Sequence, residues 1–212
     1  SDLHVPPEIL LELEADGIAV RPRASALIHA QDKIVMRRRM DALGLPNPRW
    51  AEITSPADLD RFGAEVGFPV VLKTPRGGYD GHGVRVVSSG AEAEEWLAAH
   101  PALLAEEKVD FVRELSAMVA RTPSGQVQAW PAVESLQEDG ICVEAVAPAP
   151  NSTPEILAAA EQLSRDVATE LGVTGVLAVE LFETTDENGQ PEIIVNELAM
   201  RPHNTGHWTQ DG

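Results

Sequence analysis

The dipeptide Asn188-Gly189 constrains the fold more than any other feature of this sequence, because Asn-Gly between two apolar runs is a strong signal for a β-hairpin. If these are the two central residues of a type I′ turn, the turn sets the register of the hairpin. This register places Glu180 directly opposite Glu197. The flanking runs, both with the composition of β-strands, are 175–183 and 192–199.

Apolar residues share the predicted faces of this glutamate pair, so the pair is expected on the apolar, core-facing side of the sheet. Like charges that face one another across a sheet destabilise it, and burial increases the cost. A divalent cation removes the conflict, and carboxylates completed by waters and substrate phosphates are typical of Mg²⁺ sites. The alternative is a longer loop, which shifts the register and points one glutamate to solvent. The apolar residues are Val176, Ala178 and Phe182 on one strand, and Ile193, Val195 and Ala199 on the other.

The remaining patterns alternate between helix and strand, which predicts an α/β or α+β fold with antiparallel sheet in the second half. Helices are expected near 10–15, 32–43, 55–66, 89–100 and 153–171. Strands, besides the two of the hairpin, are expected near 18–20, 68–74, 84–88, 103–109, 116–121, 127–133 and 141–147.

The charge balance limits the kinds of molecule that this chain is expected to bind. The chain has 16 basic and 34 acidic residues, a formal net charge of −18. This disfavours nucleic acid and anionic membrane surfaces, since Lys and Arg drive binding to both. No run is long and apolar enough to span a bilayer, and the first residues lack the pattern of a secretory signal. Together with a single cysteine, Cys142, this favours a cytoplasmic location.

A glycine-rich loop lies between two of the predicted strands. Residues 77–83 contain four glycines, which let a backbone approach an anion closely. The loop is not a P-loop, since neither a helix nor a Gly-Lys-Ser/Thr end follows it. We interpret it as a flexible lid, with Lys73 on the preceding strand able to reach a phosphate. The alternative is an ordinary glycine-rich hairpin loop.

A polar run follows the second strand of the hairpin: residues 201–208 read Arg-Pro-His-Asn-Thr-Gly-His-Trp. Its two histidines could suggest zinc, but no third soft ligand is near and Arg201 would repel a cation. Arg, His, Asn and Thr side chains can each donate a hydrogen bond, so the run suits a small oxyanion better. The alternative is a polar loop anchored by a buried tryptophan.

These motifs together resemble the ATP-grasp superfamily, and within it the family of N5-carboxyaminoimidazole ribonucleotide synthases. The resemblance covers most of the chain, and the Asn-Glu-Leu-Ala motif with the polar run after it is the most specific part. The motifs that carry it are Ala30-Gln31-Asp32-Lys33, the loop 77–83, Glu180-Leu181-Phe182, Asn196-Glu197-Leu198-Ala199 and 201–208.

The resemblance implies an α+β ATP-grasp fold with two subdomains that contain antiparallel sheet. The smaller, lid-bearing subdomain would be 31–105, and the larger, with the MgATP and bicarbonate sites, 106–212. Residues 1–30 would be the tail of an N-terminal α/β domain, and a C-terminal domain would be absent.

The resemblance also assigns roles to individual residues. Lys33 and Lys73 are expected to contact ATP phosphates, the segment 106–109 to hold adenine, and Glu114 to bind the ribose. The metal, Mg²⁺ or Mn²⁺, is expected on Glu180 and Glu197. The full set of expected ATP contacts is Lys33, Lys73, Gly78, Tyr79, Asp80, Gly81, His82, Gly83, Val84, Glu106, Glu107, Lys108, Val109, Glu114, Gln137, Asn196 and Glu197. The expected catalytic residues are Tyr79 and Asp80, which face aminoimidazole ribonucleotide, and Arg201, His203, Asn204 and Thr205, which hold bicarbonate.

The implied activity is the ATP- and bicarbonate-dependent carboxylation of 5-aminoimidazole ribonucleotide in purine biosynthesis. Bicarbonate attacks the γ-phosphate of ATP to give carboxyphosphate and ADP, and the carboxyl group then passes to the exocyclic amine. A closing lid would protect carboxyphosphate from water. A homodimer is expected for the complete enzyme. The sequence departs from common family residues at His82, Val84, Met200 and Thr205, none of which is an expected metal ligand.

Two other functions are left open by the residues. Another ATP-grasp ligase, such as the formate-using purine enzyme or a carboxylase subunit, would share the glutamate pair and the lysines but not the polar run as written. A truncated, non-catalytic module would bind MgATP and turn nothing over.

Overall fold

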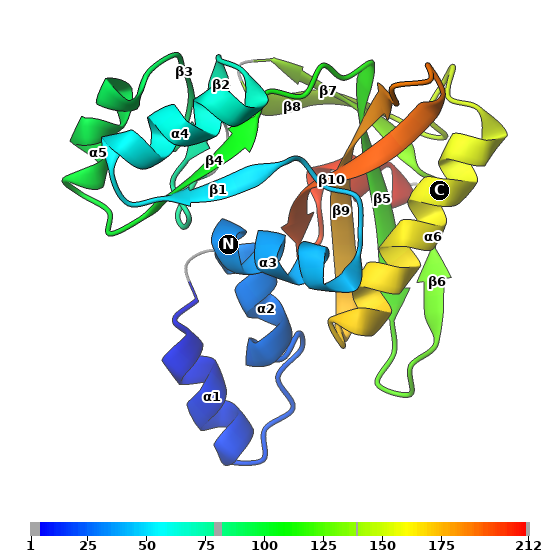
Figure 1. Ribbon diagram of the computed structural model, residues 1–212. Coiled ribbons are helices and arrows are strands. Elements are labelled where there is room, and N and C mark those ends of the chain that lie inside the picture. The colour runs from blue at the N-terminus through cyan, green and yellow to red at the C-terminus, as the bar shows by residue number, and fades with distance from the viewer. Residues whose placement is uncertain (1–4, 79–81, 139, 211–212) are drawn as a thin grey trace.

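Two antiparallel sheets, one small and one large, form the framework of the molecule (Figure 1). The computed structural model describes residues 5–78, 82–138 and 140–210. The four-stranded sheet has the order β1-β4-β2-β3, and the six-stranded sheet has the order β10-β9-β5-β7-β8, with β6 paired to β5. The strands are β1 (Trp50–Ile53), β2 (Val70–Lys73), β3 (Val84–Val87), β4 (Leu103–Glu107), β5 (Arg113–Arg121), β6 (Val127–Ala129), β7 (Val133–Glu138), β8 (Ile141–Val146), β9 (Gly175–Thr185) and β10 (Pro191–Ala199). The helices are α1 (Pro7–Ala15), α2 (Ala24–Gln31), α3 (Lys33–Leu43), α4 (Pro56–Val66), η2 (Gly90–Ala93), α5 (Glu94–Leu97), α6 (Pro154–Glu170) and η3 (Asn204–Gln210).

Each sheet buries one face against helices. Helix α6 covers one face of the large sheet, where Leu163 and Val167 pack with Leu177 and Leu181 of β9. Helices α2 and α3 extend the same core, to which α3 contributes Met36 and Met40. The small sheet has its own core against α4, formed by Ile53, Leu59, Phe62, Val70, Leu72, Val87, Ala93, Leu103 and Ala105. The boundaries proposed at 30/31 and 105/106 stay predictions.

The start of α3 is fixed by its capping residue. The Asp32 carboxylate accepts hydrogen bonds from the backbone amides of Ile34 and Val35, both at 3.1 Å. Gly44 ends the helix with φ +66°, a left-handed conformation that glycine adopts at little cost. The cap therefore holds Lys33, the first helical residue, at the edge of the space between the sheets.

The β9–β10 hairpin has a different turn from the one predicted. The Asp186 amide donates to the Gln190 carbonyl at 2.8 Å, which leaves 187–189 as a loop that is one residue longer. The register next to the turn is shifted accordingly, with Val195 opposite Leu181. A β-bulge between Val195 and Glu197 then adds one residue to β10, so Glu197 does lie opposite Glu180. The predicted pair is confirmed, but the two-residue turn is wrong.

The bulge also changes which residues share a face with Glu197. Ile193 and Val195 pack in the core of the large sheet, whereas Glu197 and Ala199 line the space between the sheets. The prediction of a core-facing glutamate pair is therefore wrong. The extra residue in β10 moves Glu197 off the face of Ile193 and Val195. In β9 the face that carries Glu180 and Phe182 lines the cavity, while the other face packs in the core.

Most other predicted elements are present with shifted ends, and the exceptions have local causes. Residues 18–20 form no strand, since they pair with no other described strand. The predicted strand 127–133 is two strands, β6 and β7, separated at Pro131, which has no amide hydrogen for a ladder. The predicted helix 89–100 is the short pair η2 and α5, and Glu92 accepts from the Ser88 amide at 2.8 Å. Helix α2 and strand β1 were not predicted.

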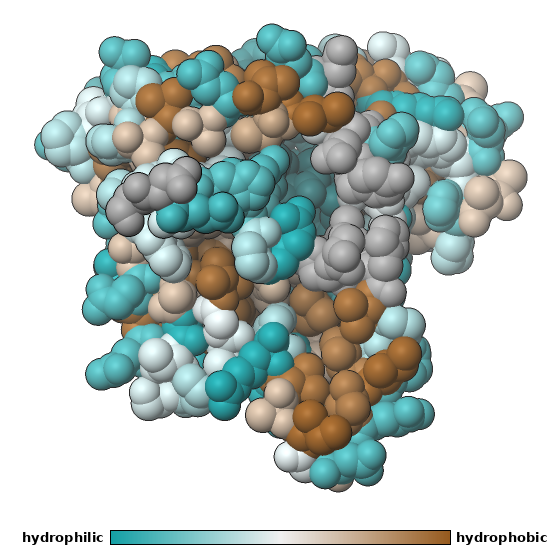
Figure 2. All heavy atoms as spheres, turned by 180° about the vertical axis from the view of Figure 1, so that it is seen from behind, coloured by the Kyte–Doolittle hydropathy of each residue, from teal (hydrophilic) through white to brown (hydrophobic). Residues whose placement is uncertain are grey.

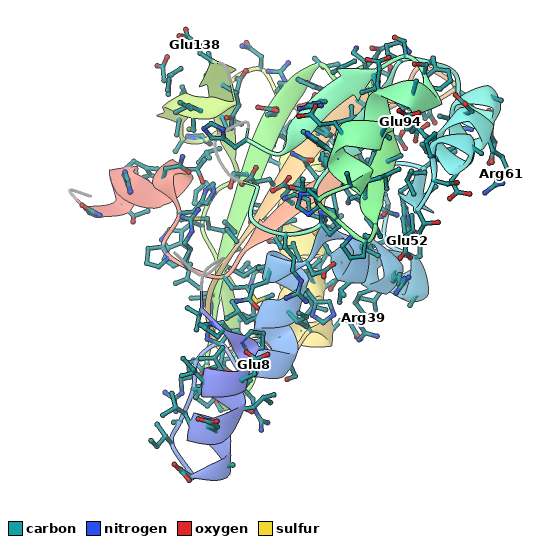
Figure 3. All side chains as sticks on the ribbon, turned by 90° about the vertical axis from the view of Figure 1, so that its left-hand side faces the viewer. Glu8, Arg39, Glu52, Arg61, Glu94 and Glu138 are labelled. Carbon is teal, nitrogen blue, oxygen red and sulfur yellow. The ribbon has the colours of Figure 1, made fainter. Side chains whose placement is uncertain are left out.

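Several charged side chains lie far from the space between the sheets. Arg61, Glu94 and Glu138 lie at the periphery of the molecule (Figure 3). Within the described part of the chain, no helix has the length and apolar character needed to cross a membrane.

We expect Thr153→Ala to lower the stability of the fold through α6. The Thr153 hydroxyl accepts from the Ile156 amide at 3.3 Å at the start of this helix. Losing such a cap costs about 1 kcal/mol, so the midpoint of thermal unfolding should fall by about 2–4 °C. Thr153→Ser, which keeps the hydroxyl, should restore the midpoint. An unchanged midpoint for Thr153→Ala would show that the cap contributes nothing.

Candidate functional site

A cavity of about 470 Å³ lies between the small and the large sheet. The space-filling view shows a hollow lined by hydrophilic residues on the face opposite to that of Figure 1 (Figure 2). Its walls are built by α3, β2, β3 and β4 on one side and by β7, β8, β9 and β10 on the other. The predicted site residues that line it are Lys33, Lys73, Gly78, His82, Val84, Glu106, Glu107, Lys108, Val109, Glu114, Gln137, Glu180, Asn196, Glu197, Arg201, His203 and Asn204.

The other predicted site residues fall into two groups. Tyr79, Asp80 and Gly81 lie outside the described residues. Gly83 and Thr205 are described, but they do not line the cavity. Gly83 instead has a structural reason to be glycine. Its backbone is left-handed, with φ +74°, and an added Cβ would collide with the Thr74 hydroxyl oxygen.

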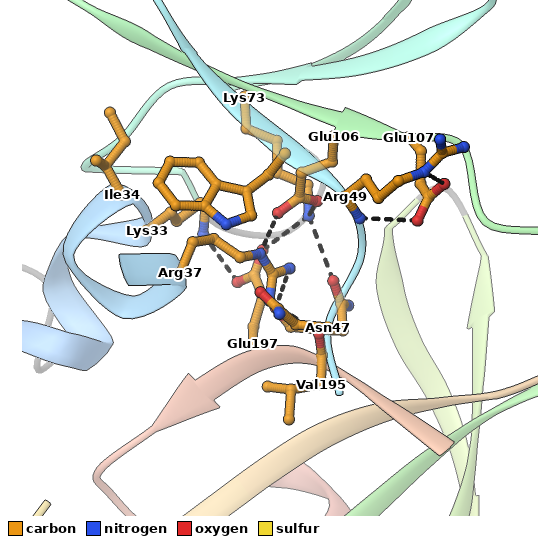
Figure 4. Close-up of polar contacts among 12 residues, drawn as sticks. Lys33, Ile34, Arg37, Asn47, Arg49, Lys73, Glu106, Glu107, Val195 and Glu197 are labelled. Atoms are coloured by element: carbon orange, nitrogen blue, oxygen red, sulfur yellow. Dashed lines mark hydrogen bonds and ion pairs between the residues drawn. The ribbon is translucent and has the colours of Figure 1, made fainter. Parts of the chain in front are cut away.

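Glu197 is the centre of a group of charged side chains on the cavity wall (Figure 4). Its carboxylate lies 2.9 Å from Lys33 Nζ and 3.7 Å from Lys73 Nζ. Burial alone raises the pKa of Glu197, but the charges of Lys33 and Lys73 outweigh this effect and lower the pKa overall. The carboxylate is thus held ionised and paired with two cations that come from different elements.

Glu106 is the second buried carboxylate of this group. It lies 2.8 Å from Lys73 Nζ and 2.6 Å from Arg37 Nε. Burial raises the pKa of Glu106, but the charges of Lys73 and Arg37 more than compensate and lower it to about 2. Lys73 therefore bridges Glu106 and Glu197, and its Nζ also donates to Asn196 Oδ1 at 3.3 Å.

Glu180, the cross-strand partner of Glu197, lies near two further titratable side chains. Its carboxylate is 3.1 Å from His203 Nε2. Glu114, on the neighbouring strand β5, has its pKa raised to about 7 by burial and by the negative charge of Glu180. Two carboxyl groups, Glu114 and Glu180, thus lie close together on the cavity wall, where a cation would offset their negative charge.

Part of the polar run 201–208 lines the cavity, and part of it is buried in the interior. Arg201, His203 and Asn204 line the cavity. Thr205 lies behind His203: its hydroxyl is 2.8 Å from His203 Nδ1 and donates to Ser116 Oγ at 2.9 Å. This position favours an indirect role for Thr205 through His203.

The alternatives considered for this run do not match the structure. His203 is buried while His207 is exposed, so the two imidazoles do not share one site. Trp208 is 38% exposed and does not form a buried anchor.

The donor set of the cavity fits a hard cation held by few protein ligands. Glu180 and Glu197 face each other and supply oxygen only. Within residues 5–78, 82–138 and 140–210, no group of three or more His, Cys, Asp or Glu side chains could hold a metal. Two carboxylates completed by water and phosphate oxygens is the arrangement typical of Mg²⁺.

Sequence reasoning missed several residues of this region, among them Phe111, Cys142 and Arg37. Phe111 lines the cavity and stacks on Phe182, with ring centroids 4.6 Å apart. Cys142 lines the cavity from β8. Arg37 is fully buried next to Glu106, although the run Arg37-Arg38-Arg39 looks like a solvated face. Only the apolar neighbours Met36 and Met40 could have indicated that this part of the helix is buried.

Comparison with known proteins places this geometry in a family. Residues 38–212 match the family model of the ATP-grasp domain. The chain belongs to the ATP-grasp family. The predicted ATP-grasp fold, with mixed helices and antiparallel sheets, is confirmed.

Within the ATP-grasp family, the chain is similar to N5-carboxyaminoimidazole ribonucleotide synthases. It is 54% identical to the synthase of Mycobacterium tuberculosis over 99% of this chain and 49% of that protein. A solved structure of the Aspergillus clavatus synthase with ATP matches with a TM-score of 0.88 and 33% identity, over 99% of this chain and 55% of that one. The A. clavatus synthase with ADP and 5-aminoimidazole ribonucleotide matches with a TM-score of 0.85 and 31% identity, over 98% and 54%. The chain thus spans about half the length of the curated relatives it matches.

We expect the pKa of Glu114, raised to about 7, to make stability depend on pH. An acid whose folded pKa exceeds its unfolded value stabilises the fold below the unfolded pKa, and this contribution is lost as pH rises through the folded pKa. The thermal midpoint, measured with a chelator present, should therefore fall between pH 5 and pH 8. Glu114→Gln should reduce this fall, whereas Glu187→Gln, in the exposed turn, should not. Equal falls for both variants would contradict the assignment.

Proposed function

We propose that this chain is the ATP-grasp part of an N5-carboxyaminoimidazole ribonucleotide synthase and that it binds MgATP in the cavity between the sheets. The observation that carries the proposal is the convergence of Lys33, Lys73, Glu180 and Glu197 on one cavity. The relatives that match over nearly the whole chain carry this enzyme name, and related structures contain ATP or ADP with 5-aminoimidazole ribonucleotide.

Lys33 and Lys73 are placed to neutralise the triphosphate. Both ammonium groups contact the Glu197 carboxylate, Lys33 from α3 and Lys73 from β2. A triphosphate in the cavity offers stronger acceptors, and a cation on Glu197 removes the charge that attracts the lysines. The lysines would then move from the carboxylate to phosphate oxygens over a short distance.

Glu180 and Glu197 would hold Mg²⁺ or Mn²⁺ against the phosphates. When bound, the cation supplies charge neutralisation at the transferring phosphoryl group. His203 orients Glu180 through its Nε2, and Asn196 orients Lys73. These contacts hold Glu180 and Lys73 in place before the ligand arrives, which lowers the cost of binding.

Arg201, His203 and Asn204 form the part of the cavity that suits bicarbonate. A planar guanidinium donates two parallel hydrogen bonds to a carboxylate-like anion. Bicarbonate oxygen attacks the γ-phosphorus, and the bond from that phosphorus to the oxygen of ADP breaks. The amine nitrogen of aminoimidazole ribonucleotide then attacks the carboxyl carbon of carboxyphosphate, releases inorganic phosphate and loses its proton.

Several finer expectations belong to this proposal. Adenine would lie along 106–109, near the stacked pair Phe111 and Phe182. The loop 77–83 would act as the lid, with Tyr79 and Asp80 facing the ribonucleotide. The homodimer and the cytoplasmic location stay predictions.

The deciding experiment is substrate-dependent release of phosphate from ATP by the full-length protein. Release that requires both aminoimidazole ribonucleotide and bicarbonate supports the proposal. Release with formate in place of bicarbonate would indicate another ATP-grasp ligase. MgATP binding without any substrate-dependent release would indicate a non-catalytic module.

We expect Glu197→Gln to weaken Mg²⁺-dependent ATP binding by about tenfold or more, since even groups that only orient metal ligands contribute that much. Isothermal titration calorimetry of MgATP measures the change. Glu187→Gln is the matched control, because it removes the same charge from the exposed turn. Equal effects of the two variants would exclude Glu197 as a metal ligand.

We expect Arg201→Lys to raise the bicarbonate concentration needed for half-maximal activity, while the KM for ATP stays unchanged. Lysine keeps the charge but loses the planar pair of donors. The measurement is steady-state kinetics of the full-length protein with bicarbonate and ATP varied separately. Arg61→Lys on the distant helix α4 is the control. Unchanged bicarbonate dependence would place the bicarbonate site elsewhere.

A further inference from the structure

Arg37 is a fully buried arginine whose guanidinium contacts three groups from two other elements (Figure 4). Its Nε donates to Glu106 Oε1 of β4 at 2.6 Å. Its Nη1 donates to the Val195 carbonyl and its Nη2 to the Asn196 carbonyl, both at 2.8 Å. One side chain of α3 thus connects the small sheet to the edge of the large one.

The two carbonyls belong to the bulge of β10. In a regular strand, successive carbonyls point to opposite edges, so one side chain cannot bond two consecutive carbonyls along the same edge. At a bulge the extra residue breaks this alternation. The two terminal nitrogens of Arg37 therefore bond two consecutive carbonyls on the same edge of β10. This arrangement of carbonyls exists only where β10 is bulged, between Val195 and Glu197.

The bulge decides which side chain of β10 faces Glu180. The register next to the turn, with Val195 opposite Leu181, would place Asn196 opposite Glu180 if it continued unchanged. Glu197 would then share the core-facing side with Ile193 and Val195. With the bulge, Glu197 lies opposite Glu180 on the cavity wall.

Strand β10 is the edge strand of its sheet, so neighbouring elements must satisfy its outward-facing polar groups. The Val195 amide donates to the Pro46 carbonyl at 2.8 Å, and Arg37 takes the two carbonyls. The segment that includes α3 and the loop after it therefore covers the bulged part of this edge.

We propose that Arg37 is a positioning residue that holds the β10 bulge and thereby directs Glu197 to the metal site. This inference rests on the proposed function, because that function assigns Glu197 to Mg²⁺. Arg37 itself does not line the cavity, so its effect is exerted through Glu197.

The test is the free Mg²⁺ concentration that half-saturates ATP binding, measured on the full-length protein and on Arg37→Lys. Lysine keeps a positive charge for Glu106, but a single ammonium cannot reproduce the fork on two carbonyls. We expect the Mg²⁺ requirement to rise about 10- to 100-fold, as for other groups that orient metal ligands. Saturating Mg²⁺ should restore ATP binding. A merely structural role would lower the thermal midpoint and leave the Mg²⁺ requirement unchanged.

Arg38→Lys is the matched control, because Arg38 is the next residue of α3, is exposed, and pairs with Glu52 on the surface. If Arg37→Lys does not fold, Arg37→Met is the second variant: it loses the same carbonyl contacts without burying an ammonium group. Loss of folding in both variants, or an unchanged Mg²⁺ requirement in a folded one, would overturn the proposal for Arg37. If the unmodified protein shows no Mg²⁺-dependent ATP binding, the proposed function fails, and the inference about Arg37 fails with it.

Discussion

The constraint on which this structure depends is the placement of two carboxylates, one buried and one partly exposed, between two sheets. Glu106 and Glu197 lie at the junction of the small and the large sheet, where an uncompensated charge would be costly. Three cations from two elements compensate them: Lys33 and Arg37 of α3, and Lys73 of β2. The junction therefore forms only when α3, β2, β4 and β10 are all in place, which ties the geometry of the cavity to the completion of the fold.

Under the proposed function, this arrangement also explains how a strongly acidic chain would bind a polyanion. The formal net charge is −18, yet the cavity wall collects Lys33, Lys73 and Arg201. In the absence of ligand, carboxylates balance the two lysines, so the site is not a region of strong positive potential. In the proposed function, a nucleotide that arrived with its cation would exchange partners with groups already in place, and both charges would be satisfied. Local pairing, and not net charge, would then determine the class of ligand.

The glutamate pair shows how a correct prediction can come from an incorrect turn. The Asn188-Gly189 signal located the hairpin, but the loop is one residue longer than assumed. The bulge between Val195 and Glu197 adds one residue to β10 and so cancels the shift in register caused by the longer loop. Glu197 therefore lies opposite Glu180 as predicted. The predicted face was wrong for two reasons: the bulge moves Glu197 off the face of Ile193 and Val195, and the face of β9 that carries Glu180 lines the cavity. A turn rule describes the strands only up to the first bulge, because one extra residue reverses every side chain beyond it.

The sequence by itself determined the alternation of helices and strands, the hairpin, the glycine loop and the motifs that carry Lys33, Lys73, Glu180 and Glu197. These depend on local spacing and residue type, which a single chain displays directly. Only the tertiary structure decided that Arg37 reaches Val195, 158 positions away, and that Thr205 lies behind His203. Glu114 likewise gains a raised pKa only because folding buries it next to Glu180. Such contacts depend on how separate elements pack, and no local pattern in the sequence specifies that packing.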